Sequence, residues 1–157
     1  DVNDALLGMG PFSPDRAGAL PIGGVVKLCF SGDYSQKELE TKFSKKSGLL
    51  AYLGTSDLIE VEEMIENGDD KAKLIFDAMA FQIAKEIGAM TAVLKNQIDG
   101  IILTGGMANS RLLLDKIKEH IGSHGKIFEQ PGELEMKALA AGAFRVLDNK
   151  EQALEYK

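Results

Sequence analysis

The fold is decided by the stretch Gly100-Ile101-Ile102-Leu103-Thr104-Gly105-Gly106-Met107-Ala108-Asn109-Ser110. Residues 100–104 are apolar over the length of a single strand, which is typical of a strand buried in a mixed or parallel sheet. Two glycines end this run, and Asn109 or Ser110 can then cap a helix that reaches about Ile121. The stretch therefore predicts a strand that passes directly into a helix.

The residues that follow repeat this pattern. Lys126–Glu129 forms a second short strand that stops at Pro131-Gly132, and a helix is predicted from about Glu133 to Leu147. Alternation of strand and helix favours an α/β fold. Because helix outweighs strand over the whole chain, we expect a helix-rich domain with a mixed sheet, as in a partly covered sheet or half of a larger protein.

The longest helix precedes this region, from about Asp70 to Lys95. A helix of about 25 residues spans roughly 37 Å, enough to cross a domain. Apolar residues lie on two of its faces, which is more than one amphipathic face requires. A core helix and a subunit interface therefore both stay open. Small residues that would allow close helix approach are Ala80, Ala84, Gly88, Ala89 and Ala92.

Earlier helices are predicted by their capping residues. Ser35 with Glu38 three positions later forms a capping-box pattern, and that helix closes at Ser47-Gly48. Ser56 or Asp57 can cap a second helix that runs to about Glu66. Before these, the apolar segment Gly24–Phe30 fits helix or strand equally by pattern alone.

Composition limits the classes of function. The chain has 157 residues, 45% hydrophobic, with a net charge of −6, which suits one acidic globular domain and disfavours nonspecific nucleic-acid binding. No apolar stretch reaches the roughly 18 residues of a membrane span, and the start is not a signal peptide. Cys29, the one cysteine, precludes an internal disulfide and is predicted to be a buried thiol. We expect a cytoplasmic protein, trimmed from a longer chain because no initiator Met is present.

Three local features could carry chemistry. The Thr104–Ser110 junction could admit a ligand to its glycine backbone and to a helix N-terminus, or be only a tight turn. Arg16, in a loop rich in Gly and Pro, could stabilise a phosphoryl group or pair with Asp15. Glu133 and Glu135 could cap a helix or hold Mg²⁺.

Other catalytic patterns find little support. His120 and His124 are four residues apart, but Gly122 lies between them and no third ligand has suitable spacing. We interpret both as solvated histidines near a helix end. The sequence also contains no G-x-S-x-G, Cys/His or zinc motif, so the hydrolase and metalloprotein classes are disfavoured.

Taken together, four segments resemble the acetate and butyrate kinase family, within the superfamily of acetate kinases, sugar kinases, heat-shock chaperones and actin. No single segment is specific, but their order and spacing are, over about residues 1–147. The segments are 1–18 with Gly10-Pro11-Phe12-Ser13-Pro14-Asp15-Arg16, then 45–57 with Gly54-Thr55-Ser56-Asp57, then Ile102-Leu103-Thr104-Gly105-Gly106 with Asn109-Ser110, and Pro131-Gly132-Glu133-Leu134-Glu135-Met136.

The resemblance implies a fold and a set of roles. The fold would be the C-terminal domain of an actin-like (ribonuclease H-like) ATPase. Arg16 would contact the phosphoryl group in transfer, and Glu135 would hold Mg²⁺ directly or through water. The cofactor would be ATP or ADP, with Asp57 on the nucleoside. The remaining residues implied around adenosine and the α-phosphate are Leu58, Gly105, Gly106, Met107 and Asn109.

Two details resemble the butyrate branch of this family. The N-terminal loop reads Gly10-Pro11-Phe12-Ser13-Pro14, and the loop Gly105-Gly106-Met107-Ala108-Asn109 is one residue shorter than in the acetate branch. Leu58-Ile59 also replaces a bulky-Arg pair of the acetate branch, which leaves no guanidinium to stack on adenine there. The implied reaction is reversible phosphoryl transfer from ATP to butyrate. A kinase for acetate, propionate or a sugar, and a nucleotide-binding or dimerisation module, are the alternatives.

The resemblance also implies a division of the chain. Residues 1–24 would be the loop with the arginine, 25–147 the nucleotide-side domain, and 148–157 a polar tail. An N-terminal domain with the phosphate loop and most of the acyl site would be missing, so we expect no activity from this chain alone. Expected partners are ATP, a short-chain carboxylate and a second copy, without nucleic acid or membrane.

Overall fold

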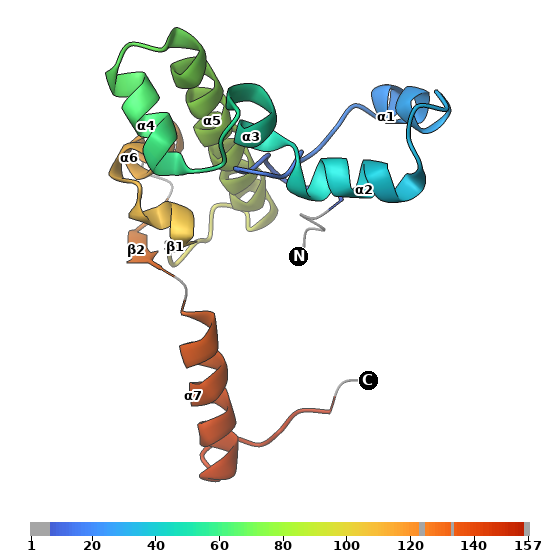
Figure 1. Ribbon diagram of the computed structural model, residues 1–157. Coiled ribbons are helices and arrows are strands. Elements are labelled where there is room, and N and C mark those ends of the chain that lie inside the picture. The colour runs from blue at the N-terminus through green and yellow to red at the C-terminus, as the bar shows by residue number, and fades with distance from the viewer. Residues whose placement is uncertain (1–6, 123–124, 133, 156–157) are drawn as a thin grey trace.

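A computed structural model describes residues 7–122, 125–132 and 134–155. Helices α3 to α6 form a bundle beside a small sheet, α1 and α2 extend to one side, and α7 projects away beyond β2 (Figure 1). The elements are α1 (Ile22–Cys29), α2 (Gln36–Lys45), α3 (Gly48–Leu53), α4 (Leu58–Glu66), α5 (Asp70–Val93), β1 (Ile101–Gly105), the 3-10 helix η1 (Gly106–Asn109), α6 (Arg111–Ile121), β2 (Ile127–Pro131) and α7 (Glu135–Leu147).

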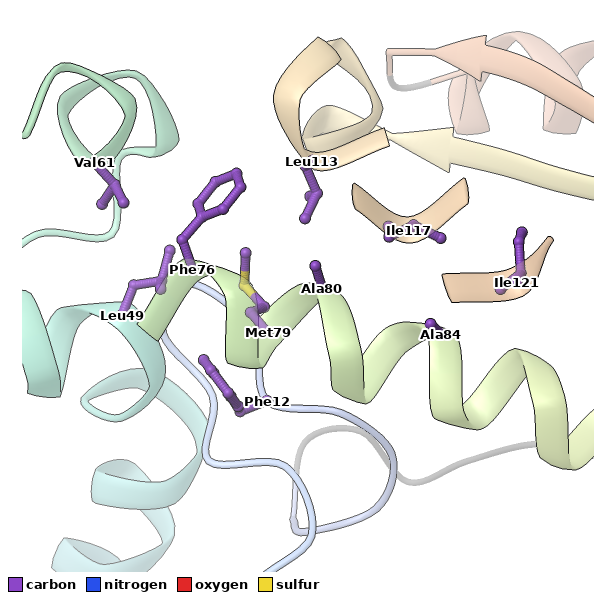
Figure 2. Close-up of a cluster of buried hydrophobic side chains, with 10 residues drawn as sticks. All are labelled: Phe12, Leu49, Val61, Phe76, Met79, Ala80, Ala84, Leu113, Ile117 and Ile121. Carbon is purple, nitrogen blue, oxygen red and sulfur yellow. The ribbon is translucent and has the colours of Figure 1, made fainter. Parts of the chain in front are cut away.

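The core is built on α5. Phe76, Met79 and Ala80 of this helix are fully buried, and the other elements bring side chains to them from several directions (Figure 2). Burial of large apolar side chains is the main favourable term in folding. The cluster also contains Phe12 from the N-terminal loop, Leu49 of α3, Val61 of α4, Ala84 of α5, and Leu113, Ile117 and Ile121 of α6.

The small residues of α5 divide into two groups. Ala80 and Ala84 are buried and face α6, so the prediction of close helix approach is confirmed for these two. The other three positions, Gly88, Ala89 and Ala92, are exposed and serve no such contact. The second apolar face of α5 is open, since Leu74 is 66% exposed and Phe81 53%. Within the described residues, nothing covers that face completely.

The predicted capping residues begin the helices. The Ser35–Glu38 capping box at α2 is formed by both of its hydrogen bonds, and the Asp57 side chain caps α4. Ser110, rather than Asn109, caps α6. Caps can be read from sequence because a short polar side chain satisfies N–H groups within its own turn.

Several segments differ from the sequence-based expectation. Gly24–Phe30 resolves as part of the helix α1, which has no buried residue, so Cys29 is exposed and its predicted burial was wrong. Helix α3 was not predicted. Helix α7 begins at Glu135, and its expected start at Glu133 lies outside the described residues. No helix in the described part of the chain is long and apolar enough to cross a membrane.

The described sheet has two strands, β1 and β2, which run parallel from the pair Ile101–Ile127 to the pair Gly105–Pro131. An antiparallel bridge between Gly105 and Gly132 adjoins them. The expected burial of the first strand on both faces was wrong, because Ile102 is 67% exposed. The helix bundle covers only the face with Ile101, which packs against the core.

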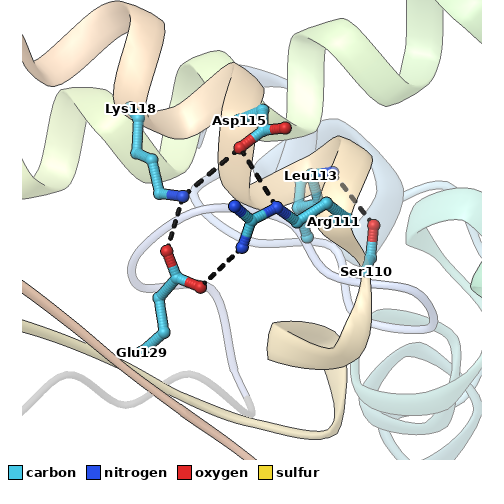
Figure 3. A network of polar contacts seen from close by, with 6 residues as sticks. All are labelled: Ser110, Arg111, Leu113, Asp115, Lys118 and Glu129. Carbon is cyan, nitrogen blue, oxygen red and sulfur yellow. Dashed lines mark hydrogen bonds and ion pairs between the residues drawn. The ribbon is translucent and has the colours of Figure 1, made fainter.

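A polar network fastens β2 to α6 (Figure 3). Glu129 of β2 receives Arg111 Nη1 at 2.9 Å and Lys118 Nζ at 2.5 Å, and Asp115 is shared between the same two cations. The hydrogen bond from Lys118 holds the pKa of Glu129 below its ordinary value. The carboxylate is therefore ionised at neutral pH, and the link between strand and helix persists there.

Gly48 fixes the N-terminal loop against α3. Its φ is +58°, and a Cβ at this position would overlap the carbonyl oxygen of Ser13. That close approach allows Leu50 N–H to donate to Pro14 O at 2.9 Å and Ser47 N–H to donate to Asp15 O at 2.9 Å. The loop that carries Arg16 is thus held by backbone contacts that only glycine permits.

We predict that Gly48→Ala destabilises the chain by about 1–3 kcal/mol more than Gly54→Ala. Both glycines have positive φ, which costs an alanine roughly 1–2 kcal/mol. Only Gly48 adds an overlap with backbone, and forced overpacking costs about 1–3 kcal/mol. Urea unfolding of the two variants and the unchanged chain measures the difference. Equal losses would show that the loop yields without cost.

Candidate functional site

A pocket of about 670 Å³ lies between the start of α4 and the segment that joins β1 to α6. Such a volume is within the range of small-molecule sites. It is lined by Pro14 of the N-terminal loop, by Ser56, Asp57, Leu58, Ile59 and Glu62, and by Gly106, Met107, Asn109 and Ser110. Five residues that sequence reasoning assigned to a nucleotide, from two distant segments, therefore share one pocket.

The α4 wall begins at Asp57. Its Oδ1 accepts a hydrogen bond from the Ile59 N–H at 2.9 Å, so one carboxylate oxygen caps the helix. Asp57 is exposed and Leu58 is half-buried, which gives this wall a charged rim and an apolar interior. Asp57 is the N-cap of α4 and Leu58 its first residue, so the start of the helix fixes the positions of both.

The opposite wall is the junction after β1. Gly105 has φ +89° and ψ 179°, a conformation essentially restricted to glycine. A Cβ built at Gly105 or Gly106 would meet no atom within 4 Å, so the backbone faces open space there. The expected tight turn contains one turn of 3-10 helix, closed by the Asn109 amide, which donates to Gly106 O at 2.8 Å.

Gly105 takes a different place from its neighbours. It does not line the pocket but pairs with Pro131, and its carbonyl oxygen accepts from Gly132 N–H at 3.1 Å. Gly105 therefore anchors the junction to the sheet, while Gly106, Met107 and Asn109 face the pocket.

Ser110 and Glu62 join the two walls. Ser110 is buried, and its Oγ accepts from Leu113 N–H at 2.9 Å (Figure 3). The same hydroxyl forms a hydrogen bond with Glu62 Oε1. Sequence reasoning missed Glu62. Its position four residues after Leu58, on the same face of α4, was the available signal.

Arg16 lies beside the pocket rather than in its lining, although Pro14 of the same loop reaches it. Arg16 N–H donates to Ser13 Oγ at 3.2 Å. In the part of the chain that the structure describes, its guanidinium pairs with no carboxylate, so the alternative of an ion pair with Asp15 was wrong. Asp15 Oδ1 instead accepts a hydrogen bond from Ser13 Oγ at 3.5 Å.

Glu135 begins α7, is exposed and does not line the pocket. It does not cap the helix, because Leu134 holds that position without a side-chain hydrogen bond. Among the described residues, no group of three or more His, Cys, Asp or Glu side chains gathers to hold a metal. A single exposed carboxylate still fits Mg²⁺, which takes one or two carboxylates together with phosphate oxygens and water.

The two histidines give no further site. His120 is exposed at the end of α6, as predicted, with its ring edge-on to Phe81 at 5.6 Å between centroids. His124 lies outside the described residues. A separate hollow of about 600 Å³ over α2 contains Lys37, Lys42 and Lys46, and none of the predicted site residues line it.

Comparisons with solved structures show the fold. The chain resembles Porphyromonas gingivalis acetate kinase with a TM-score of 0.76 and 23% identity, over 88% of this chain and 41% of that one. Entamoeba histolytica acetate kinase gives 0.70 and 19%, over 88% and 43%. A Francisella tularensis propionate kinase gives 0.65 and 21%, over 81% and 38%. The predicted α/β fold of the actin-like ATPase class is confirmed.

The chain thus spans about two fifths of the length of these structures. A family model described as the acetokinase family matches residues 6–141. Because this match includes most of the sequence, the chain belongs to the acetokinase family.

Proposed function

We propose that this chain is the nucleotide-binding part of a carboxylate kinase, which transfers a phosphoryl group reversibly from ATP to butyrate. The observation that carries the proposal is the pocket, where Asp57 and Leu58 lie opposite Gly106, Met107 and Asn109. Membership of the acetokinase family supports a carboxylate as the acceptor.

The pocket has the groups that a nucleoside needs. Leu58, Ile59 and Met107 offer apolar surface for a flat base, and the Asp57 carboxylate can accept from hydroxyl groups. The open backbone at Gly106, on the exposed side of the junction after β1, leaves room for a phosphate to approach its N–H groups. Nucleoside and phosphate would therefore lie along the junction between α4 and α6.

The remaining roles belong to residues outside the pocket. The Arg16 guanidinium, which is free of carboxylate partners in the described chain, would neutralise charge on the phosphoryl group in transfer. Glu135 would hold Mg²⁺, which when bound neutralises charge on the nucleotide phosphates. Both side chains must approach the pocket for catalysis, so these roles require the rest of the kinase.

Butyrate is proposed from the sequence of the site. The Gly10-Pro11-Phe12-Ser13-Pro14 loop and the short Gly105–Asn109 loop favour the butyrate branch over the acetate branch. The structures named above are acetate and propionate kinases, so a kinase for one of those acids is the second candidate. Acyl-chain preference of the intact enzyme decides between them.

We predict that MgATP shifts the backbone amide resonances of residues 57–62 and 106–110. Gly106→Val should weaken binding about tenfold, because its side chain would occupy open space in the pocket that the nucleotide needs, at a cost of about 1–3 kcal/mol. Gly88→Val is the matched control, since Gly88 also has open space around it but lies on α5. Shifts confined to the lysine hollow over α2 would contradict the proposed pocket.

We also predict no detectable butyryl phosphate from this 157-residue chain with ATP and butyrate, because it spans only about two fifths of the length of the carboxylate kinases that it resembles. Hydroxylamine trapping of the acyl phosphate is the measurement, with an intact carboxylate kinase as positive control. Turnover comparable to that control would refute the need for a second domain.

We further propose that the exposed face of α5 is a homo-oligomer interface, because Leu74 and Phe81 lie open on it. Phe81→Glu should convert an associated species to monomer in sedimentation velocity. Ile22→Glu on α1 removes an apolar group that is even more exposed and should leave association unchanged. A monomeric wild-type chain would rule out this interface for the chain by itself.

A further inference from the structure

We propose that Glu62 makes the pocket selective for purines with a 6-amino group, and so for adenine nucleotides. This inference rests on the proposed nucleotide site and adds a specificity-determining residue to it. Among the carboxylates that line the pocket, Glu62 of α4 forms a hydrogen bond with Ser110 on the opposite wall.

Glu62 belongs to the less exposed part of the pocket lining, which we call its enclosed end. There Ser110 is 9% exposed, and Glu62, Leu58 and Met107 are half-buried, whereas Asp57, Gly106 and Asn109 are exposed. A charged triphosphate favours the solvent-exposed end, where its hydration is kept. The enclosed end is therefore left for the base.

The charges at the α6 N-terminus also favour the base, rather than the phosphates, at this end of the pocket. The Ser110 hydroxyl accepts from Leu113 N–H and is bonded to Glu62, so a carboxylate already stands beside the positive end of the helix dipole. A phosphate placed there would meet like charge. A neutral base that donates a hydrogen bond would be attracted instead.

The second carboxylate oxygen of Glu62, Oε2, determines which group of a ligand it can bind. Glu62 Oε1 is bonded to Ser110, and within the described residues Oε2 has no hydrogen-bond donor. An ionised carboxylate only accepts. The 6-amino group of adenine donates two hydrogen bonds, while the 6-oxo group of guanine or hypoxanthine would place an acceptor against this oxygen. Glu62 therefore favours the aminopurine and opposes the oxopurine.

The test compares ATP with purine riboside triphosphate, which lacks only the 6-amino group, by amide-shift titration of the 157-residue chain. Dissociation constants for the unchanged chain should differ about tenfold in favour of ATP, the effect of one hydrogen bond to a charged group. Glu62→Gln should reduce this ratio to about twofold or less. Glu63→Gln, an adjacent and exposed position outside the pocket, should keep the ratio.

A third nucleotide separates base from sugar. If Glu62 contacts the ribose, the effect of Glu62→Gln would disappear with 2′-deoxyATP and persist with purine riboside triphosphate, which would overturn the assignment to the 6-amino group. Equal weakening of all three nucleotides by Glu62→Gln, or no discrimination by the unchanged chain, would make Glu62 a structural link only. If no nucleotide shifts the amide resonances of residues 57–62 or 106–110, the proposed function itself is refuted.

Discussion

Burial of one face of α5 is the constraint on which the other elements depend. Phe76, Met79 and Ala80 have no exposed surface, and every wall of the candidate site reaches this cluster through one of its own side chains. Val61, which lies between the pocket residues Leu58 and Glu62, packs α4 against this core. Leu113 packs the first turn of α6 against it. Because packed interiors tolerate little displacement, the distance between the two walls is set by the core beneath them.

The same core holds the N-terminal loop less directly. Phe12 enters the cluster, and its N–H donates to Gln82 of α5 at 3.1 Å, which brings Pro14 to the pocket. The loop then leaves the core, and Arg16 is held by backbone contacts around Gly48. This difference separates a pocket whose walls rest directly on the core from a loop that Phe12 alone connects to it.

Sequence reasoning succeeded where the cause of a structure is local. Caps at Ser35, Asp57 and Ser110 depend on a hydrogen bond within one turn, and the long α5 depends on its own periodicity. It failed where burial is decided elsewhere. Cys29 was expected inside because its neighbours are apolar, yet α1 contains no buried residue and Cys29 is exposed. Glu62 was missed because its partner Ser110 is 48 residues away.

Several spaced segments considered together predicted pocket residues that no single segment indicates. Asp57 and Asn109 each have a local role, as a helix cap and as the closure of a 3-10 turn, and neither role alone indicates a ligand. Each uses only part of the polar side chain, which leaves the second oxygen of Asp57 and the amide oxygen of Asn109 for other partners. A structural role therefore leaves these residues free for a further partner, and a resemblance based on several spaced segments can select residues that share one pocket although each alone has only a local role.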